Sequence, residues 1–193
     1  MNRVGAPGNT AGAEPAWIAE VLQYWFAELD EAHWFENSRT VDQQIRYRFL
    51  SLHERLAAGD GASAATPREL LATIIVLDQF SRNLYRRTPR AYAADPMALQ
   101  LARRALSQGA DRDMTDEQKQ FMYMPFQHSE DPQDQARSLA LFEKLGKETW
   151  IEYARAHKTI IDRFGRFPHR NEILGRTSSP EEAASIREPM GSF

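Results

Sequence analysis

The sequence has no cysteine in its 193 residues, and its hydrophobic runs are short. The lack of cysteine excludes disulfides, thiolate nucleophiles and zinc sites that need sulfur ligands. The longest strongly apolar run, Ile74-Ile75-Val76-Leu77, is far shorter than the roughly 20 residues that a transmembrane helix requires. We therefore expect no membrane-spanning segment.

β-Branched aliphatic residues are also scarce, since the chain has 9 Ile and 4 Val against 26 Ala and 16 Leu. This excess of helix-forming residues predicts an all-α fold. The length and the 42% hydrophobic content fit a single domain, which we place at residues 15–193. Residues 1–14 lack the apolar stretch of a secretory signal, so we expect a mobile N-terminal tail and a cytoplasmic protein.

Charge of one sign does not dominate the chain, whose formal net charge is −3. This balance gives no electrostatic reason to expect nucleic acid or an anionic membrane as a partner. The sequence also contains no phosphate-binding Gly-rich loop, dinucleotide fingerprint or Gly-x-Ser-x-Gly elbow. Enzymes that depend on those motifs are therefore excluded, and no cofactor can be assigned.

Hydrophobic periodicity and helix-capping residues predict about seven helices joined by short loops. The expected helices cover residues 17–29, 38–58, 67–80, 95–108, 115–124, 131–145 and 150–164, and a last short helix starts at Ser179. The helix over 67–80 is apolar on most of its circumference and should be central, whereas Asp95 should cap the helix that it opens. Stacked antiparallel pairs are expected, as a bundle or a short α-solenoid, although no repeat of about 34 residues is visible.

A first polar motif lies in the segment from Asp78 to Arg90, which has one acidic residue and four Arg. Asp78 lies within an apolar helical run, and an ionised carboxylate there needs a partner such as Arg82, one turn later. Asn83 and Arg86 extend the motif as candidate ligand-binding residues. The structural alternative is an intrahelical ion pair followed by a basic helix C-terminus.

A second motif places His128 within three residues of Glu130 and Asp131, before a helix that Ser129 or Asp131 can cap. The caps explain the other residues, but His128 has no evident structural task. An imidazole titrates near neutral pH, so His128 and Glu130 are candidates for acid–base catalysis.

A third motif, residues 163–176, is rich in Arg and follows a helix that contains His157. Gly165 and Pro168 predict an irregular backbone from which Arg166, His169, Arg170 and Asn171 project. The whole chain has 20 Arg but only 4 Lys, a bias that favours bidentate binding of phosphate or carboxylate. The structural alternative is a C-terminal lock, in which these side chains pair with the acidic segment 111–134.

A metal site is conceivable from residue type, because five side chains could supply nitrogen and oxygen ligands: His128, Glu130, Asp131, His157 and His169. Their spacing matches neither a zinc-protease helix nor a calcium loop. We therefore predict no metal site.

These motifs, in this order, resemble a bacterial family known as domain of unknown function 924, whose members have a tetratricopeptide-like helical fold. The resemblance covers residues 17–193. It is carried by Trp25-Phe26, Trp34-Phe35, residues 77–83, Pro89-Arg90-Ala91, Asp95, Tyr123 with Pro125, residues 128–131, Gln135, His157, residues 164–171 and residues 174–176. Ser81 and Tyr92 depart from the usual Pro and Phe. The resemblance implies the fold but no activity and no catalytic residues.

Two functional hypotheses follow. In the first, the three motifs converge on a pocket for a small anionic ligand, which bears phosphate or carboxylate. His128, His169, Asp78 and Glu130 would then serve proton transfer or hydrolysis. The ligand-binding residues would be Arg82, Asn83, Arg86, His157, Arg166, Arg170 and Asn171. In the second, the protein is a tetratricopeptide-like module that binds a protein or peptide, and its polar clusters are buried structural networks.

Overall fold

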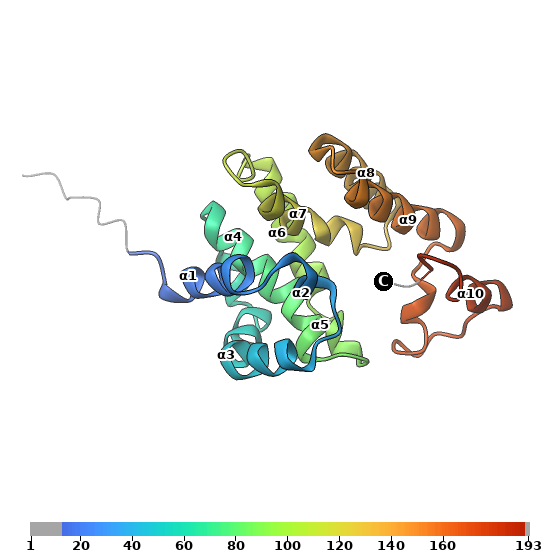
Figure 1. The fold of residues 1–193 in the computed structure, drawn as a ribbon, viewed down its shortest axis with the longest axis horizontal. Coiled ribbons are helices and arrows are strands. Elements are labelled where there is room, and N and C mark those ends of the chain that lie inside the picture. The colour runs from blue at the N-terminus through green and yellow to red at the C-terminus, as the bar shows by residue number, and fades with distance from the viewer. Residues whose placement is uncertain (1–12, 192–193) are drawn as a thin grey trace, which may run out of the picture.

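Residues 13–191 are described by the computed structural model, and within this range the chain forms helices and no β-strand (Figure 1). The predicted N-terminal tail falls almost entirely outside the described residues. Seven α-helices have eight residues or more, which agrees with the prediction of about seven. These are α1 (Ala16–Gln23), α3 (Arg39–Ala57), α4 (Pro67–Ile74), α6 (Asp95–Ser107), α7 (Asp116–Gln127), α8 (Pro132–Leu145) and α9 (Glu148–Phe164).

Shorter helical elements connect the long ones. They are the α-helices α2 (Glu31–Phe35), α5 (Ser81–Leu84) and α10 (Pro180–Ser185), the π-helical turns η1 (Tyr24–Glu28) and η3 (Ile75–Phe80), and the 3₁₀ turns η2 (Asp60–Ser63), η4 (Pro89–Ala91) and η5 (Pro168–Arg170). Because α4, η3 and α5 follow one another without a break, they form one helical rod from Pro67 to Leu84. This rod corresponds to the central helix that the sequence predicts.

Local sequence explains most helix ends. Thr115 and Gln118 form a reciprocal capping box at the start of α7, and Asp131 accepts a hydrogen bond from the backbone N–H of Gln133 at the start of α8. Gly146 and Gly165 end α8 and α9 with left-handed φ angles of 69° and 68°, which glycine adopts without a steric penalty. The prediction for Asp95 is wrong, because Ala94 is the N-cap of α6 and Asp95 is the first helical residue.

The main core surrounds the central rod. Every residue from Leu71 to Ser81 is buried, and the rings of Trp25 and Phe49 lie 5.6 and 5.0 Å from that of Phe80. The rod packs against α1, α3, α6 and α7. From α6 onward each long helix packs against the next, so α8 lies between α7 and α9 (Figure 1). This packing is that of a helical bundle.

Residues 165–191, here termed the C-terminal segment, follow the end of α9 and carry η5 and α10 at one edge of the molecule (Figure 1). Their apolar contacts are modest: Phe167 forms a small separate cluster with Ile160 and Ile161 of α9, flanked by Phe164. None of the helices in the described range is both long and apolar enough to cross a bilayer.

Candidate functional site

Asp78 lies at the centre of the polar site, in the π-helical turn η3. Its side chain is only 1% exposed. A π-turn widens the helix and changes its hydrogen bonds, and such turns are frequent at functional sites. Here the carbonyls of Leu77 and Asp78 accept hydrogen bonds from the side chains of Ser81 and Arg82, each at 2.5 Å. The turn therefore brings Arg82 against the residue whose carboxylate it neutralises.

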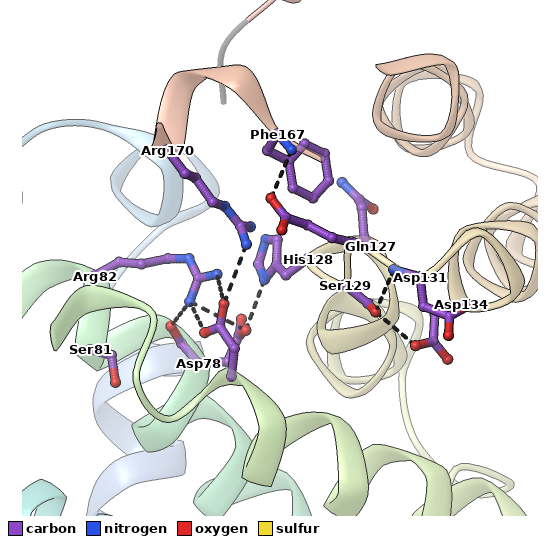
Figure 2. Close-up of polar contacts among 12 residues, drawn as sticks. Asp78, Ser81, Arg82, Gln127, His128, Ser129, Asp131, Asp134, Phe167 and Arg170 are labelled. Atoms are coloured by element: carbon purple, nitrogen blue, oxygen red, sulfur yellow. Dashed lines mark hydrogen bonds and ion pairs between the residues drawn. The ribbon is translucent and has the colours of Figure 1, made fainter. Parts of the chain in front are cut away.

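The carboxylate of Asp78 has three partners. His128 Nδ1 lies 2.8 Å from Oδ1 and Arg82 Nη1 lies 3.3 Å from Oδ1 (Figure 2). Gln79 Nε2 donates to Oδ2. Burial alone would raise the pKa of Asp78, but the charge of Arg82 and the contact with His128 outweigh it and lower that pKa. Asp78 is therefore an anion at neutral pH.

His128 is the residue that ends α7, and its side chain is 14% exposed. Burial and the nearby charge of Arg82 lower the pKa of His128, against the opposing effect of Asp78. A neutral imidazole beside an ionised carboxylate donates its Nδ1–H, so that Nε2 carries the lone pair. The pair thus holds His128 in the tautomer that can accept a proton at Nε2.

Asp95 links two arginines at this site. Arg82 donates from Nη1 and Nη2 to the two carboxylate oxygens of Asp95, at 3.0 and 3.1 Å. Arg170, which comes from η5, reaches the same carboxylate only at 3.7 Å, from Nη1 to Oδ2. Asp78, Arg82, Asp95, His128 and Arg170 are here called the polar cluster, and Figure 2 shows the two guanidinium groups approaching Asp78 and His128 from different elements.

Arg170 has the poorest hydrogen bonding and charge compensation in the polar cluster. Its side chain is 8% exposed, and its Nε has no hydrogen-bond partner among the described residues. The rings of Tyr92 and Phe167 lie 4.7 and 4.5 Å from Cζ and supply cation–π contacts. Burial and the charge of Arg82 lower the pKa of Arg170, a sign that this cation is poorly compensated.

Two further predicted histidines border the polar cluster. The ring of His157 lies 6.3 Å from that of His128, and its Nδ1 lies 2.8 Å from the carbonyl oxygen of Tyr153. The ring of His169 lies 5.6 Å from that of Phe167. Burial is the main cause that lowers both pKa values, that of His169 to about 4. Both imidazoles are therefore neutral at pH 7.

The carboxylate of Glu130 is engaged by the C-terminal segment and is therefore not available for acid–base catalysis. It accepts a hydrogen bond from the backbone N–H of Phe167 at 2.8 Å and pairs with both terminal nitrogens of Arg176, at 2.8 and 3.0 Å. These bonds hold the C-terminal segment to the turn that follows His128. They match the C-terminal lock that the sequence offers as the structural alternative.

Four other predicted ligand-binding residues lie outside the polar cluster. Asn83 and Arg86 both bind Asp42 of α3, at distances of 2.6 to 2.9 Å. Arg166 binds Glu182 of α10, and Asn171 binds Ser178. Their polar groups serve pairs that join one element to another. The structure therefore brings together Asp78, Arg82, His128 and Arg170, with His157 and His169 beside them.

Sequence reasoning missed Asp95 and Tyr92 as site residues. Asp95 precedes Pro96 and has the pattern of a helix cap, although its carboxylate faces Arg82 and Arg170. Tyr92 lies three residues earlier, with its ring near both guanidinium groups. The large number of arginines was the signal that could have indicated these two residues, because buried guanidinium groups need acidic or aromatic partners from elsewhere in the chain.

Comparison with known proteins agrees with this fold. Residues 21–190 match a family described as "Bacterial protein of unknown function (DUF924)". The chain belongs to this family. The resemblance that the sequence motifs indicated is thus confirmed.

A similar solved structure is that of a protein of unknown function from Agrobacterium tumefaciens, with 35% sequence identity and a TM-score of 0.84. The similarity covers 90% of this DUF924 chain and 98% of the Agrobacterium protein. No curated protein matches the chain. Within residues 13–191, no group of three or more His, Asp or Glu side chains is arranged to hold a metal ion.

Proposed function

We propose that the polar cluster binds a small anionic ligand and that His128 exchanges a proton with it. The observation that carries this proposal is Arg170, a buried guanidinium whose nearest carboxylate lies at 3.7 Å, beyond hydrogen-bond distance. The alternative of a protein-interaction module rests on fold analogy alone, and no contact described above favours it.

A buried cation without a close acceptor is costly, because removing a charge from water requires a partner in return. Arg82 has such partners in Asp78 and Asp95, but Arg170 has two aromatic rings and one distant carboxylate. An anion at the free edge of Arg170 would supply the missing hydrogen bonds. Charge-assisted bonds of this kind are roughly twice as strong as neutral ones.

Proton transfer is assigned to His128 and not to the other predicted acids and bases. Asp78 is a positioning residue, since it fixes the tautomer and the orientation of the imidazole through Nδ1. Nε2 is then the atom that accepts or returns a proton. The carboxylate of Glu130 is occupied by Arg176 and by the backbone N–H of Phe167, and the ring of His169 lies 5.6 Å from that of Phe167. The reaction class is proton transfer or hydrolysis.

Ligand access depends on the exposed edge of the polar cluster. The side chains of Arg82 and Asp95 are 22% and 17% exposed, which means that solvent reaches the group even though Asp78 is sealed. A small ligand could approach along the same edge, between the C-terminal segment and α7. The side chain of His128 is 14% exposed, so it too is within reach of solvent.

The test is a thermal-shift panel of phosphorylated and carboxylated metabolites, because a ligand that binds only the folded state raises the melting temperature. Arg170→Lys keeps the charge but removes the guanidinium fork, and it should abolish the shift. Arg166→Lys is the matched control, since Arg166 binds Glu182 outside the polar cluster, and it should keep the shift. A panel without any shift, or an equal shift in Arg170→Lys, contradicts the proposal.

A second measurement separates binding from proton transfer. Because His128 is the assigned base, His128→Asn should still show ligand-induced stabilisation but lose any turnover of a substrate found by the panel. Asp78→Asn should reduce turnover through the tautomer of His128, as an acid–imidazole pair requires. Unchanged turnover in His128→Asn would remove this residue from the mechanism.

A further inference from the structure

We infer that the anionic ligand of the polar cluster is a carboxylate that carries one negative charge, and not a phosphate dianion. This inference rests on the proposed function and narrows it to one substrate class. Three features of the site support it: the number of guanidinium forks that are open, the charge balance around His128, and the rings that surround Arg170.

The two guanidinium groups of the polar cluster differ in how far their donors are engaged. Both terminal nitrogens of Arg82 already donate, to the two oxygens of Asp95 and to the backbone carbonyl of Asp78. Arg170 provides the more open fork, because its Nε has no hydrogen-bond partner among the described residues and its Nη1 lies 3.7 Å from Asp95. One planar fork matches the two oxygens of one carboxylate, whereas a phosphate dianion carries three terminal oxygens that need further donors.

The charges near His128 already balance before a ligand binds. The rod contributes Asp78 and Arg82, α6 contributes Asp95, and η5 contributes Arg170, so two carboxylates face two guanidinium groups. Glu130 and Arg176 form another neutral pair beside them. His157 of α9 and His169 of η5 add neutral rings.

A bound ligand with one negative charge brings the net charge of these groups to −1, and protonation of His128 returns that net charge to zero. A dianion brings the net charge to −2 beside Asp78 and Asp95, and a second compensating proton would have to go to His157 or His169, whose pKa values are lowered mainly by burial. In a partly desolvated site such uncompensated charge is expensive. The same balance means that binding of a monoanion draws His128 toward its protonated form, which suits a residue that returns a proton.

The aromatic contacts of Arg170 point in the same direction. Tyr92 and Phe167 each lie within 5 Å of Cζ, and the negative faces of their rings supply part of the compensation that a buried cation needs. One carboxylate is then sufficient to complete it. An anion of higher charge would gain little more from Arg170 and would meet stronger repulsion from Asp95, whose carboxylate lies 3.7 Å from the Nη1 of Arg170.

The experiment compares acetate, methanesulfonate and methyl phosphate at pH 8. Acetate is a planar monoanion, methanesulfonate is a tetrahedral monoanion, and methyl phosphate is mainly a dianion because its second pKa is about 6. Dissociation constants are read from the NMR shifts of the His128 ring during titration. We expect acetate to bind at least about ten-fold more tightly than methyl phosphate, the ratio given by 1.4 kcal/mol. Methanesulfonate should also bind more tightly than methyl phosphate.

Two variants complete the test. Arg170→Lys should weaken acetate binding by about ten-fold or more, the lower range for loss of a charged hydrogen bond. Arg166→Lys should leave it unchanged. Tighter binding of methyl phosphate than of either monoanion overturns the inference but leaves the proposed anion site standing. If none of the three anions moves the His128 signals, both the inference and the proposed function fail.

Discussion

The central rod and the C-terminal segment are fixed by different forces. Residues 71–81 of the rod are buried among apolar side chains from α1, α3, α6 and α7. The C-terminal segment has a small apolar cluster around Phe167 but four Arg–carboxylate links among the described residues, from Arg166 to Glu182, from Arg176 to Glu130, from Arg170 to Asp95 and from Arg163 to Glu188. Three of these links join the segment to the rest of the molecule.

This difference has a consequence for the polar cluster, because Asp78 and Arg82 lie on the rod and Arg170 lies on the C-terminal segment. Close packing of the core around the rod fixes the positions of Asp78 and Arg82. Arg170 is presented by a segment whose position depends on charge pairs, so it can change place at a lower free-energy cost. Perturbing the two regions should therefore give effects of different size and extent.

The largest effect is expected in the rod, from Phe80→Ala. Phe80 is fully buried and contacts the rings of Tyr24, Trp25 and Phe49. Removal of such a ring leaves a cavity and lowers the free energy of unfolding by about 3–5 kcal/mol. Denaturant unfolding measures the change for the whole molecule. Phe35→Ala is the control, since Phe35 is 56% exposed, and it should cost far less. Equal costs at the two positions would contradict the assignment of the core.

The sequence predicted the rod better than the polar cluster, for a physical reason. Apolar periodicity and caps such as Thr115 are local signals, and they located the helices and the central position of residues 67–80. The π-turn at Asp78 leaves no such signal. The contact between His128 and Asp78 joins residues 50 positions apart, so it depends on how α7 packs against the rod.

The same reasoning explains which predicted residues lie elsewhere. Arg82 and Arg86 are one helical turn apart in sequence, but α5 ends at Leu84, and Arg86 therefore turns to Asp42 of α3. Glu130 lies only two residues after His128, yet it faces Arg176. Residue type indicated that these groups need charged partners, but the choice of partner follows from tertiary packing.

The second-largest loss of stability is expected from Glu130→Ala, which should release the C-terminal segment while the rod stays folded. Glu130 holds both the backbone N–H of Phe167 and the guanidinium of Arg176. Loss of a charged acceptor that is 30% exposed costs about 1–3 kcal/mol. Hydrogen exchange should therefore rise in residues 166–176 and stay unchanged in residues 71–81.

The matched control for this variant is Glu188→Ala. Glu188 pairs with Arg163 at 3.4 Å, and both side chains are at least half exposed, so the pair should contribute at most about 1 kcal/mol. Its exchange pattern should resemble that of the unmodified protein. If Glu130→Ala also leaves residues 166–176 protected, the apolar cluster around Phe167 is sufficient to hold the segment, and the contrast between the two regions is lost.

The smallest effect is a dependence on pH that arises within the C-terminal segment. The hydrogen bonds from Arg166, followed by the backbone N–H of Ser179, lower the pKa of Glu182 from 4.5 to about 2. A carboxyl group whose pKa is lower in the folded state stabilises that state above its unfolded pKa, and the contribution is lost as the pH falls. The link between Arg166 and Glu182 should therefore hold from pH 7 to about 4.5 and weaken between pH 4.5 and about 2.

A ¹³C NMR titration of the Glu182 carboxyl group measures this pKa directly. Arg166→Ala should move the pKa toward 4.5, but not fully, because the N–H of Ser179 still donates to the carboxylate at 2.8 Å. Since Arg166 lies outside the polar cluster, this variant should leave the NMR signals of His128 where they are. A displaced His128 signal would show that the pairs within the segment are coupled to the position of Arg170, so that charge pairs and not the rod alone determine the geometry of the site.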